Sequence, residues 1–91
     1  MTSYEFEVAA KNAVIALLLE NGIEASIVDL QLVWYAHIVG SKKCMIWGQP
    51  MQNKYAEVTY SMESDMVYVD LYEKIHHKQL HAFEVDTEAH V

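Results

Sequence analysis

The chain is poor in cysteine, proline and glycine, and each shortage excludes a class of protein. Its 91 residues include one Cys, one Pro and three Gly. A single cysteine, Cys44, cannot form an internal disulfide, which favours a reducing compartment. Three glycines leave little material for a phosphate-binding loop, and the sequence has no G-x-S-x-G, H-E-x-x-H or C-x-x-C motif. We therefore predict that the protein is not an enzyme and has no cofactor.

Positive charge is also scarce. Six Lys and Arg residues stand against thirteen Asp and Glu residues, giving a formal net charge of -7. Because nucleic-acid affinity comes largely from cationic contacts with phosphates, direct binding of nucleic acid is not expected. The same charge suits a basic protein partner, or mimicry of nucleic acid toward a protein that binds it.

The sequence has no long hydrophobic run. The longest apolar stretch, Ala13 to Leu19, is far shorter than the ~20 residues that span a bilayer. The N-terminal residues lack a basic region followed by an apolar run and a cleavage site. We expect a cytoplasmic protein that does not contact a membrane.

A hydrophobic fraction of 53% predicts a packed core, and the length fits a single domain over residues 1–91. Thr2 and Glu5 have the spacing of a capping box, which predicts a helix over about 3–21. Asn21-Gly22, followed by Ile23, is typical of a Schellman stop. The apolar positions between them repeat every three or four residues: Phe6, Ala10, Ala13, Val14, Leu17 and Leu18.

After this helix the apolar period changes to two, which predicts strands over about 26–39, 43–48, 54–61 and 66–74. We expect a turn over 40–43, and a partly ordered tail over 75–91. Short connections imply antiparallel neighbours. The predicted fold is therefore α+β, with one N-terminal helix on one face of a four-stranded antiparallel meander. The other face stays open unless the tail crosses it.

The last two predicted strands have two different faces. The inward set is Ala56, Val58, Tyr60, Val67, Val69 and Leu71. The outward set is Tyr55, Glu57, Thr59, Met66, Tyr68, Asp70 and Tyr72. On the first strand we expect Leu32 and Trp34 to point inward. The outward residues there are Gln31, Val33, Tyr35, His37 and Val39.

Glu57 and Asp70 bear on the pairing of these two strands. If Val58 lies opposite Val69, Glu57 faces Asp70, and two like charges become neighbours unless a cation or proton intervenes. A two-residue shift places Glu57 opposite Tyr68 and keeps the core set. We therefore predict the shifted register, and no catalytic acid/base pair.

Two other groups of residues suggest chemistry only weakly. Cys44 is expected to be a core residue, since a nucleophile needs a base and His37 alone is near enough to propose. His77 and His81 have a spacing that holds metal ions on helices. Further ligands there would be His76, Glu84, Asp86 or His90. A solvated polar tail explains these residues better, so no metal site is predicted.

Trp34 and Trp47 have two possible roles. They could line a small-ligand cleft between helix and sheet, but in a domain of this size they more often fill the core.

The order of helix and strands, with Val33-Trp34, "YAEVTY" (Tyr55 to Tyr60) and "YVDLYEK" (Tyr68 to Lys74), resembles small uncharacterised proteins encoded by phages and prophages of Gram-positive bacteria. The resemblance covers about Phe6 to Lys74 and departs from the group over Lys42 to Pro50. It implies an accessory protein that acts in the host-cell cytoplasm.

Tyrosine and methionine side chains on an open sheet face are typical of protein interfaces. We predict binding of a protein partner, plausibly a host factor that is inhibited, through Tyr55, Glu57, Tyr68, Asp70 and Tyr72. One alternative is a nucleic-acid mimic that inhibits a DNA-binding enzyme. Another is a structural homodimer whose sheets pack face to face. In a third reading the tyrosines simply suit strands and have no partner.

Overall fold

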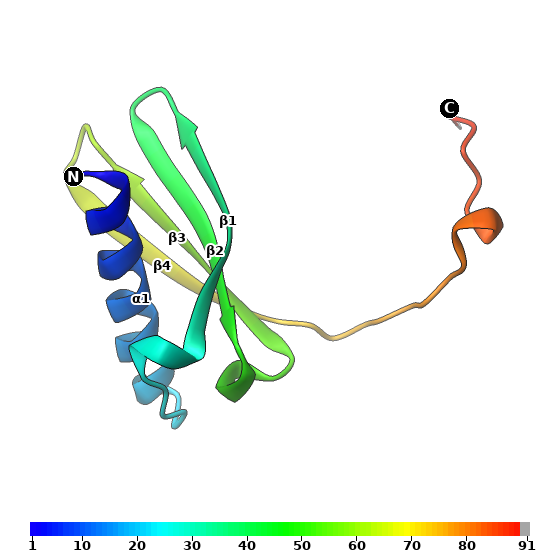
Figure 1. Cartoon of the computed structure of the whole chain (residues 1–91), viewed down its shortest axis with the longest axis horizontal. Coiled ribbons are helices and arrows are strands. Elements are labelled where there is room, and N and C mark those ends of the chain that lie inside the picture. The colour runs from blue at the N-terminus through cyan, green and yellow to red at the C-terminus, as the bar shows by residue number, and fades with distance from the viewer. Residues whose placement is uncertain (90–91) are drawn as a thin grey trace.

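The computed structural model describes residues 1–89 and contains one long helix and four strands (Figure 1). The helix is α1 (Ser3–Glu20), and the strands are β1 (Leu30–Ile38), β2 (Ser41–Gly48), β3 (Lys54–Ser61) and β4 (Met66–Glu73). The strands form one antiparallel sheet in the order β1-β2-β3-β4. This confirms the predicted α+β fold, in which a helix covers one face of an antiparallel meander.

Both ends of α1 are formed by the predicted capping residues. The Thr2 Oγ1 accepts from the Glu5 amide at 3.1 Å, and the Glu5 carboxylate accepts from the Thr2 amide at 2.8 Å. At the other end Gly22 has a φ of +77°, and the Ile23 amide donates to the Leu18 carbonyl at 2.9 Å. These are the bonds of a capping box and a Schellman motif. They give hydrogen-bond partners to backbone amides at the start of the helix and to backbone carbonyls at its end.

β1 starts later than the predicted position 26, because Ile27–Asp29 forms a short 3-10 helix. The amide and hydroxyl of Ser26 both donate to the Asp29 carboxylate, at 2.9 and 3.0 Å. The Asp29 backbone then passes directly over Gly48, where a Cβ atom would clash with the Asp29 carbonyl oxygen. The chain therefore enters the sheet through a tight contact that requires glycine at position 48.

The predicted turn over 40–43 is wrong, because Ile38 pairs with Ser41 and leaves a two-residue turn with Gly40 at a φ of +80°. The two lysines that follow, Lys42 and Lys43, are residues of β2, and the ammonium group of each has a hydrogen-bonding or ionic partner. Lys42 points to the helix side, where its buried ammonium donates to the Met1 carbonyl at 2.6 Å. Lys43 points to the opposite face.

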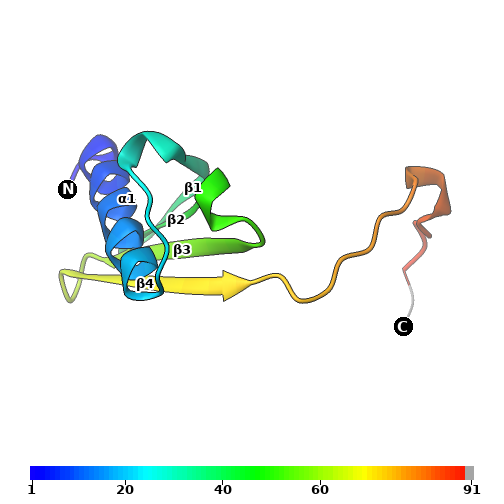
Figure 2. The same cartoon turned by 90° about the horizontal axis from the view of Figure 1, so that it is seen from below.

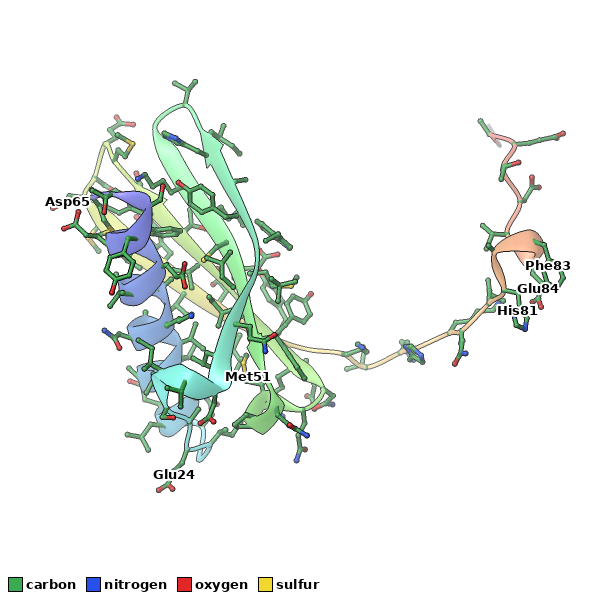
Figure 3. The ribbon with its side chains drawn as sticks, in the orientation of Figure 1. Glu24, Met51, Asp65, His81, Phe83 and Glu84 are labelled. Carbon is green, nitrogen blue, oxygen red and sulfur yellow. The ribbon has the colours of Figure 1, made fainter. Side chains whose placement is uncertain are left out.

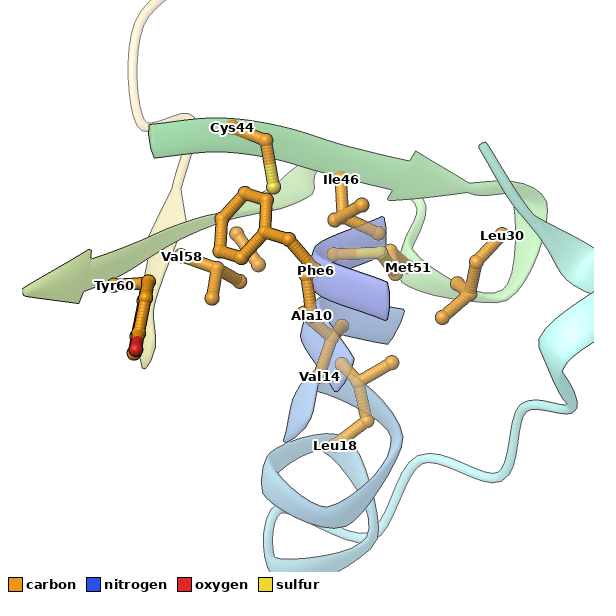
Figure 4. Packing of buried hydrophobic residues seen from close by; sticks show 11 residues of the cluster. Phe6, Ala10, Val14, Leu18, Leu30, Cys44, Ile46, Met51, Val58 and Tyr60 are labelled. Atoms are coloured by element: carbon orange, nitrogen blue, oxygen red, sulfur yellow. The ribbon is translucent and has the colours of Figure 1, made fainter. Parts of the chain in front are cut away.

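The core lies between α1 and the near face of the sheet (Figure 4). The helix contributes residues spaced four apart, which form one stripe. The buried cluster consists of Phe6, Ala10, Val14, Leu18, Leu30, Cys44, Ile46, Met51, Ala56, Val58 and Tyr60. Val67, Val69 and Leu71 of β4 are half-buried against it. The inward set predicted for β3 and β4 is confirmed.

The chain after β4 leaves the folded body as an extended arm (Figures 1 and 2). We call residues 74–89 the C-terminal arm; its only helical part is the 3-10 turn Ala82–Glu84. The Cα radius of gyration is 15.8 Å. A compact domain of this length would have about 12 Å. The arm does not cross the far face of the sheet, so that face has no second layer from the described chain.

Candidate functional site

We call the sheet face opposite α1 the open face. Its residues alternate with the core residues along each strand. They are Gln31, Trp34, Ala36 and Ile38 of β1, Ser41, Lys43, Met45 and Trp47 of β2, Tyr55, Glu57, Thr59 and Ser61 of β3, and Met66, Tyr68, Asp70 and Tyr72 of β4. All five residues predicted to bind a partner therefore lie on one surface.

Tyrosines dominate the β3–β4 side of the open face. Tyr55 lies opposite Tyr72, and their rings stack with centroids 5.1 Å apart and planes at 19°. Tyr68 lies opposite Thr59 and is 49% exposed. A stacked cross-strand pair stabilises the hairpin and holds both rings in fixed positions. The surface thus presents large, preorganised aromatic area beside a freely exposed tyrosine.

The predicted register of β3 and β4 is wrong. Val58 pairs with Val69, and Glu57 lies opposite Asp70 rather than Tyr68. The cation that this pairing requires comes from the next strand, because Lys43 Nζ lies 3.1 Å from Glu57 Oε2. The hydrogen bond to Glu57 raises the pKa of Lys43, and the nearby Asp70 adds to this shift. A third strand therefore relieves a repulsion that the hairpin alone would suffer.

A β-bulge in β1 reverses the faces predicted for its second half. Leu32 pairs with Ile46 but Trp34 pairs with Met45, so Val33 is the extra residue. Trp34 consequently lies on the open face, not in the core as predicted. The residues that were expected to point outward after it, Tyr35 and His37, move to the helix side.

Tyr35 has a definite role on that side. Its ring lies 5.9 Å from the Phe6 ring, and its hydroxyl is 3.4 Å from the Ser3 hydroxyl. The bulge therefore exchanges one aromatic residue for another between the two faces. It places a tryptophan on the open face and leaves a tyrosine to cover the first turn of α1.

The open face contains an apolar depression of about 450 Å³. Its lining includes the apolar and aromatic side chains of Val33, Met45, Trp47 and Tyr55, together with Lys54 and Lys74. The Trp47 indole donates to the Gln52 carbonyl at 3.0 Å, which fixes the ring. Sequence reasoning missed this site because it placed the tryptophans between helix and sheet. The alternation of Met45 and Trp47 with the buried Cys44 and Ile46 was the available signal.

Cys44 has the environment of a core residue. It is buried, and burial raises the pKa of its thiol to about 11. It pairs with Tyr35, whereas His37 pairs with Lys42. This environment keeps the thiol protonated, which agrees with a core role.

The C-terminal histidines do not lie on a helix. His77 and His81 belong to the extended part of the arm, so their spacing of four has no helical meaning there. His90 lies outside the described residues. Within residues 1–89 there is no group of three or more His, Cys, Asp or Glu side chains placed to hold a metal ion. In the same part of the chain, no helix has the length and apolarity needed to cross a membrane.

Over residues 1–89 the fold and the open face define the class of the protein: an α+β protein with one α-helix and four strands, whose sheet is covered on one side only. The model of a family of unknown function, DUF6275, matches residues 7–82. The chain belongs to this family. Comparison with curated proteins and with solved structures finds no match. The family match extends past β4 into the C-terminal arm.

Proposed function

We propose that the protein is a non-enzymatic binding protein that engages a protein partner through the open face. The observation that supports this most is that Tyr55, Glu57, Tyr68, Asp70 and Tyr72 share one surface that no other described part of the chain covers. Stacked and exposed tyrosines offer large contact area at low entropic cost, and residues of this kind commonly dominate binding energy at interfaces.

The charges on this surface indicate which chemistry the partner offers. Glu57 is paired with Lys43, whereas Asp70 faces Glu57 across the hairpin and lies between two tyrosines of the same strand face. A partner side chain that is cationic would relieve the remaining repulsion at Asp70 while its neighbours pack on the rings. The resemblance to phage and prophage proteins supports a host protein as this partner, which the binding would inhibit.

Nucleic-acid mimicry receives less support. It needs carboxylates in rows with the spacing of phosphates, about 7 Å along a strand. The open face instead carries Glu57 and Asp70 side by side, and one of them is neutralised by Lys43. The net charge of -7 therefore does not collect on this surface.

The experiment compares two tyrosine variants of the full chain. Tagged wild-type protein captures host proteins from a Gram-positive lysate, and the captured protein is purified and titrated calorimetrically against each variant. Tyr68→Ala combined with Tyr72→Ala should weaken the affinity by about 30-fold or more. Tyr4→Ala is the matched control, because Tyr4 is 76% exposed on α1, away from the open face.

The control should bind like the wild type, and circular dichroism should be the same for all three proteins. If the double variant keeps wild-type affinity while folded, the open face is not the binding surface. If the titrated affinity falls equally for Tyr4→Ala, the effect is not specific to that face and the proposal fails.

A further inference from the structure

The C-terminal arm exposes apolar side chains that no element of its own body covers. Its last backbone bond to the sheet is from the Lys74 amide to the Asn53 carbonyl, 2.8 Å. Beyond it Ile75 is 78% and Phe83 85% exposed, and Leu80 and Val85 are also exposed. Figure 3 shows Phe83 at the helical turn of the arm, distant from the sheet. Exposed apolar groups on an extended segment are typical of an interaction site.

The tip of the arm has a defined shape. The His81 ring stacks on the Phe83 ring, with centroids 5.4 Å apart and planes at 10°, across the 3-10 turn Ala82–Glu84. Val85 follows directly after this turn. The tip thus presents a flat aromatic pair and a branched aliphatic side chain within a few residues, which is the kind of anchor that fills a small pocket.

The depression on the open face matches this tip in size and polarity. Its volume of about 450 Å³ is within the ~300–1,000 Å³ of ordinary ligand pockets. Its apolar part contains Val33, Met45 and Trp47. If the Phe83 ring and the Val85 side chain occupied the depression, its apolar surface and theirs would be buried away from water.

The two surfaces also match in charge. The end of the arm, residues 82–89, carries Glu84, Asp86 and Glu88 and no lysine. The lining of the depression includes Lys54 and Lys74. The Lys54 ammonium lies 3.9 Å from the Glu73 carboxylate, a long and partly exposed ion pair that is readily exchanged. In a chain of net charge -7, these lysines are a natural counterpart for an acidic segment.

The arm of the same chain reaches this depression poorly. It starts at Lys74, which lines the depression, and runs away from the body (Figure 2). To return, the chain would have to reverse direction within residues 75–82, a stretch without Gly, Pro, Asn, Asp or Ser. A second copy of the chain has no such constraint. Two copies related by a two-fold axis would make the contact twice.

We propose that the protein forms a homodimer by arm exchange, in which the C-terminal arm of each copy inserts Phe83 and Val85 into the depression of the other. Glu84 and Asp86 then lie beside Lys54 and Lys74 of the receiving copy. This inference goes beyond the proposed function, since it assigns a different occupant to a surface that shares only Tyr55 with the proposed partner-binding set. The face of the dimer that carries Tyr68 stays available to a partner.

The test uses the full chain and two variants at exposed positions. Phe83→Asp removes the anchor, and Val33→Glu places a charge in the depression. Light scattering after gel filtration at high micromolar concentration measures the mass. Wild-type protein should have twice the chain mass of 10.5 kDa, and each variant should weaken the dimer by about 10-fold or more. Leu19→Asp, which makes the same kind of change at an exposed position of α1, should leave the dimer intact.

A mixing experiment separates arm exchange from other dimers. Phe83→Asp protein keeps a normal depression, and Val33→Glu protein keeps a normal arm, so an equimolar mixture restores one of the two contacts. The mixture should associate at concentrations where neither variant alone does. The proposal is overturned if the wild type is monomeric, if Phe83→Asp remains dimeric as a face-to-face dimer would, or if the mixture does not associate. Because Tyr55 lines the depression and stacks on Tyr72, the mass of the Tyr68→Ala, Tyr72→Ala protein is measured as well. If that protein dimerises normally but has lost partner affinity, the two proposals are tested separately.

Discussion

At the scale of single residues, Cys44 carries the clearest pH-dependent consequence. Burial raises the pKa of its thiol from 9.0 to about 11. A group whose pKa is higher in the folded state stabilises that state below its unfolded pKa, and this contribution is lost as the pH rises through the folded value. We therefore predict that the urea midpoint of the wild type falls between pH 9 and 11, and falls less steeply for Cys44→Ala.

The wild type and Cys44→Ala are compared by how steeply the urea midpoint changes with pH. The midpoint itself is not compared, because Cys44→Ala also changes core packing. Tyr60 contributes to the remaining slope, since its hydrogen bond to Asp65 at 2.8 Å raises the pKa of that phenol. Thiol labelling is an independent check. Two pKa units correspond to about 100-fold less thiolate at mildly alkaline pH, so native protein should react at least that much more slowly than unfolded protein. Equal slopes for both proteins would contradict the assignment.

At the scale of the strands, Lys43 links the register of β3 and β4 to β2. We predict that Lys43→Gln lowers the urea midpoint, because Glu57 then faces Asp70 without a cation. Asp70→Asn in that background should raise the midpoint again by removing one of the two like charges. Chemical denaturation of the two single variants and the double variant measures this as a double-mutant cycle.

Lys43→Arg serves as the conservative control and should stay close to the wild type. If Asp70→Asn changes the urea midpoint equally in the wild type and in Lys43→Gln, the lysine does not offset the repulsion between Glu57 and Asp70.

The same strands explain which parts of the sheet were predictable. Alternation correctly assigned the faces of β3 and β4, because each strand has one buried and one open side throughout. It failed in β1 because a bulge at Val33 changes the parity and is invisible in an unbroken apolar run such as Leu32 to Tyr35. The register of β3 and β4 failed for a related reason. The hairpin considered alone favours the shifted pairing, and the deciding charge, Lys43, lies on another strand.

At the scale of the whole molecule, the order of helix and strands followed from local signals: capping residues, period and short connections. The predicted tyrosine surface could be listed residue by residue, since it depends only on period two. The depression and the path of the arm could not, because both depend on where loops and the bulge place residues that are distant in sequence. Trp47 and Lys74 meet only in the folded chain.

The arm also determines how the stability of the whole molecule depends on concentration. The buried core ends at Tyr60, and the last half-buried core contacts are on β4, so the arm contributes nothing to the core of its own body. We predict that a chain ending at Lys74 keeps its free energy of unfolding at low concentration to within about 0.5 kcal/mol.

For the full chain, the melting temperature should rise with concentration, because only the folded protein dimerises. The truncated chain should show no such rise. Calorimetry over a range of concentrations measures both proteins. Unfolding of the truncated chain at low concentration would mean that the arm stabilises its own body, and identical concentration dependence of the two would mean that the arm does not join the copies.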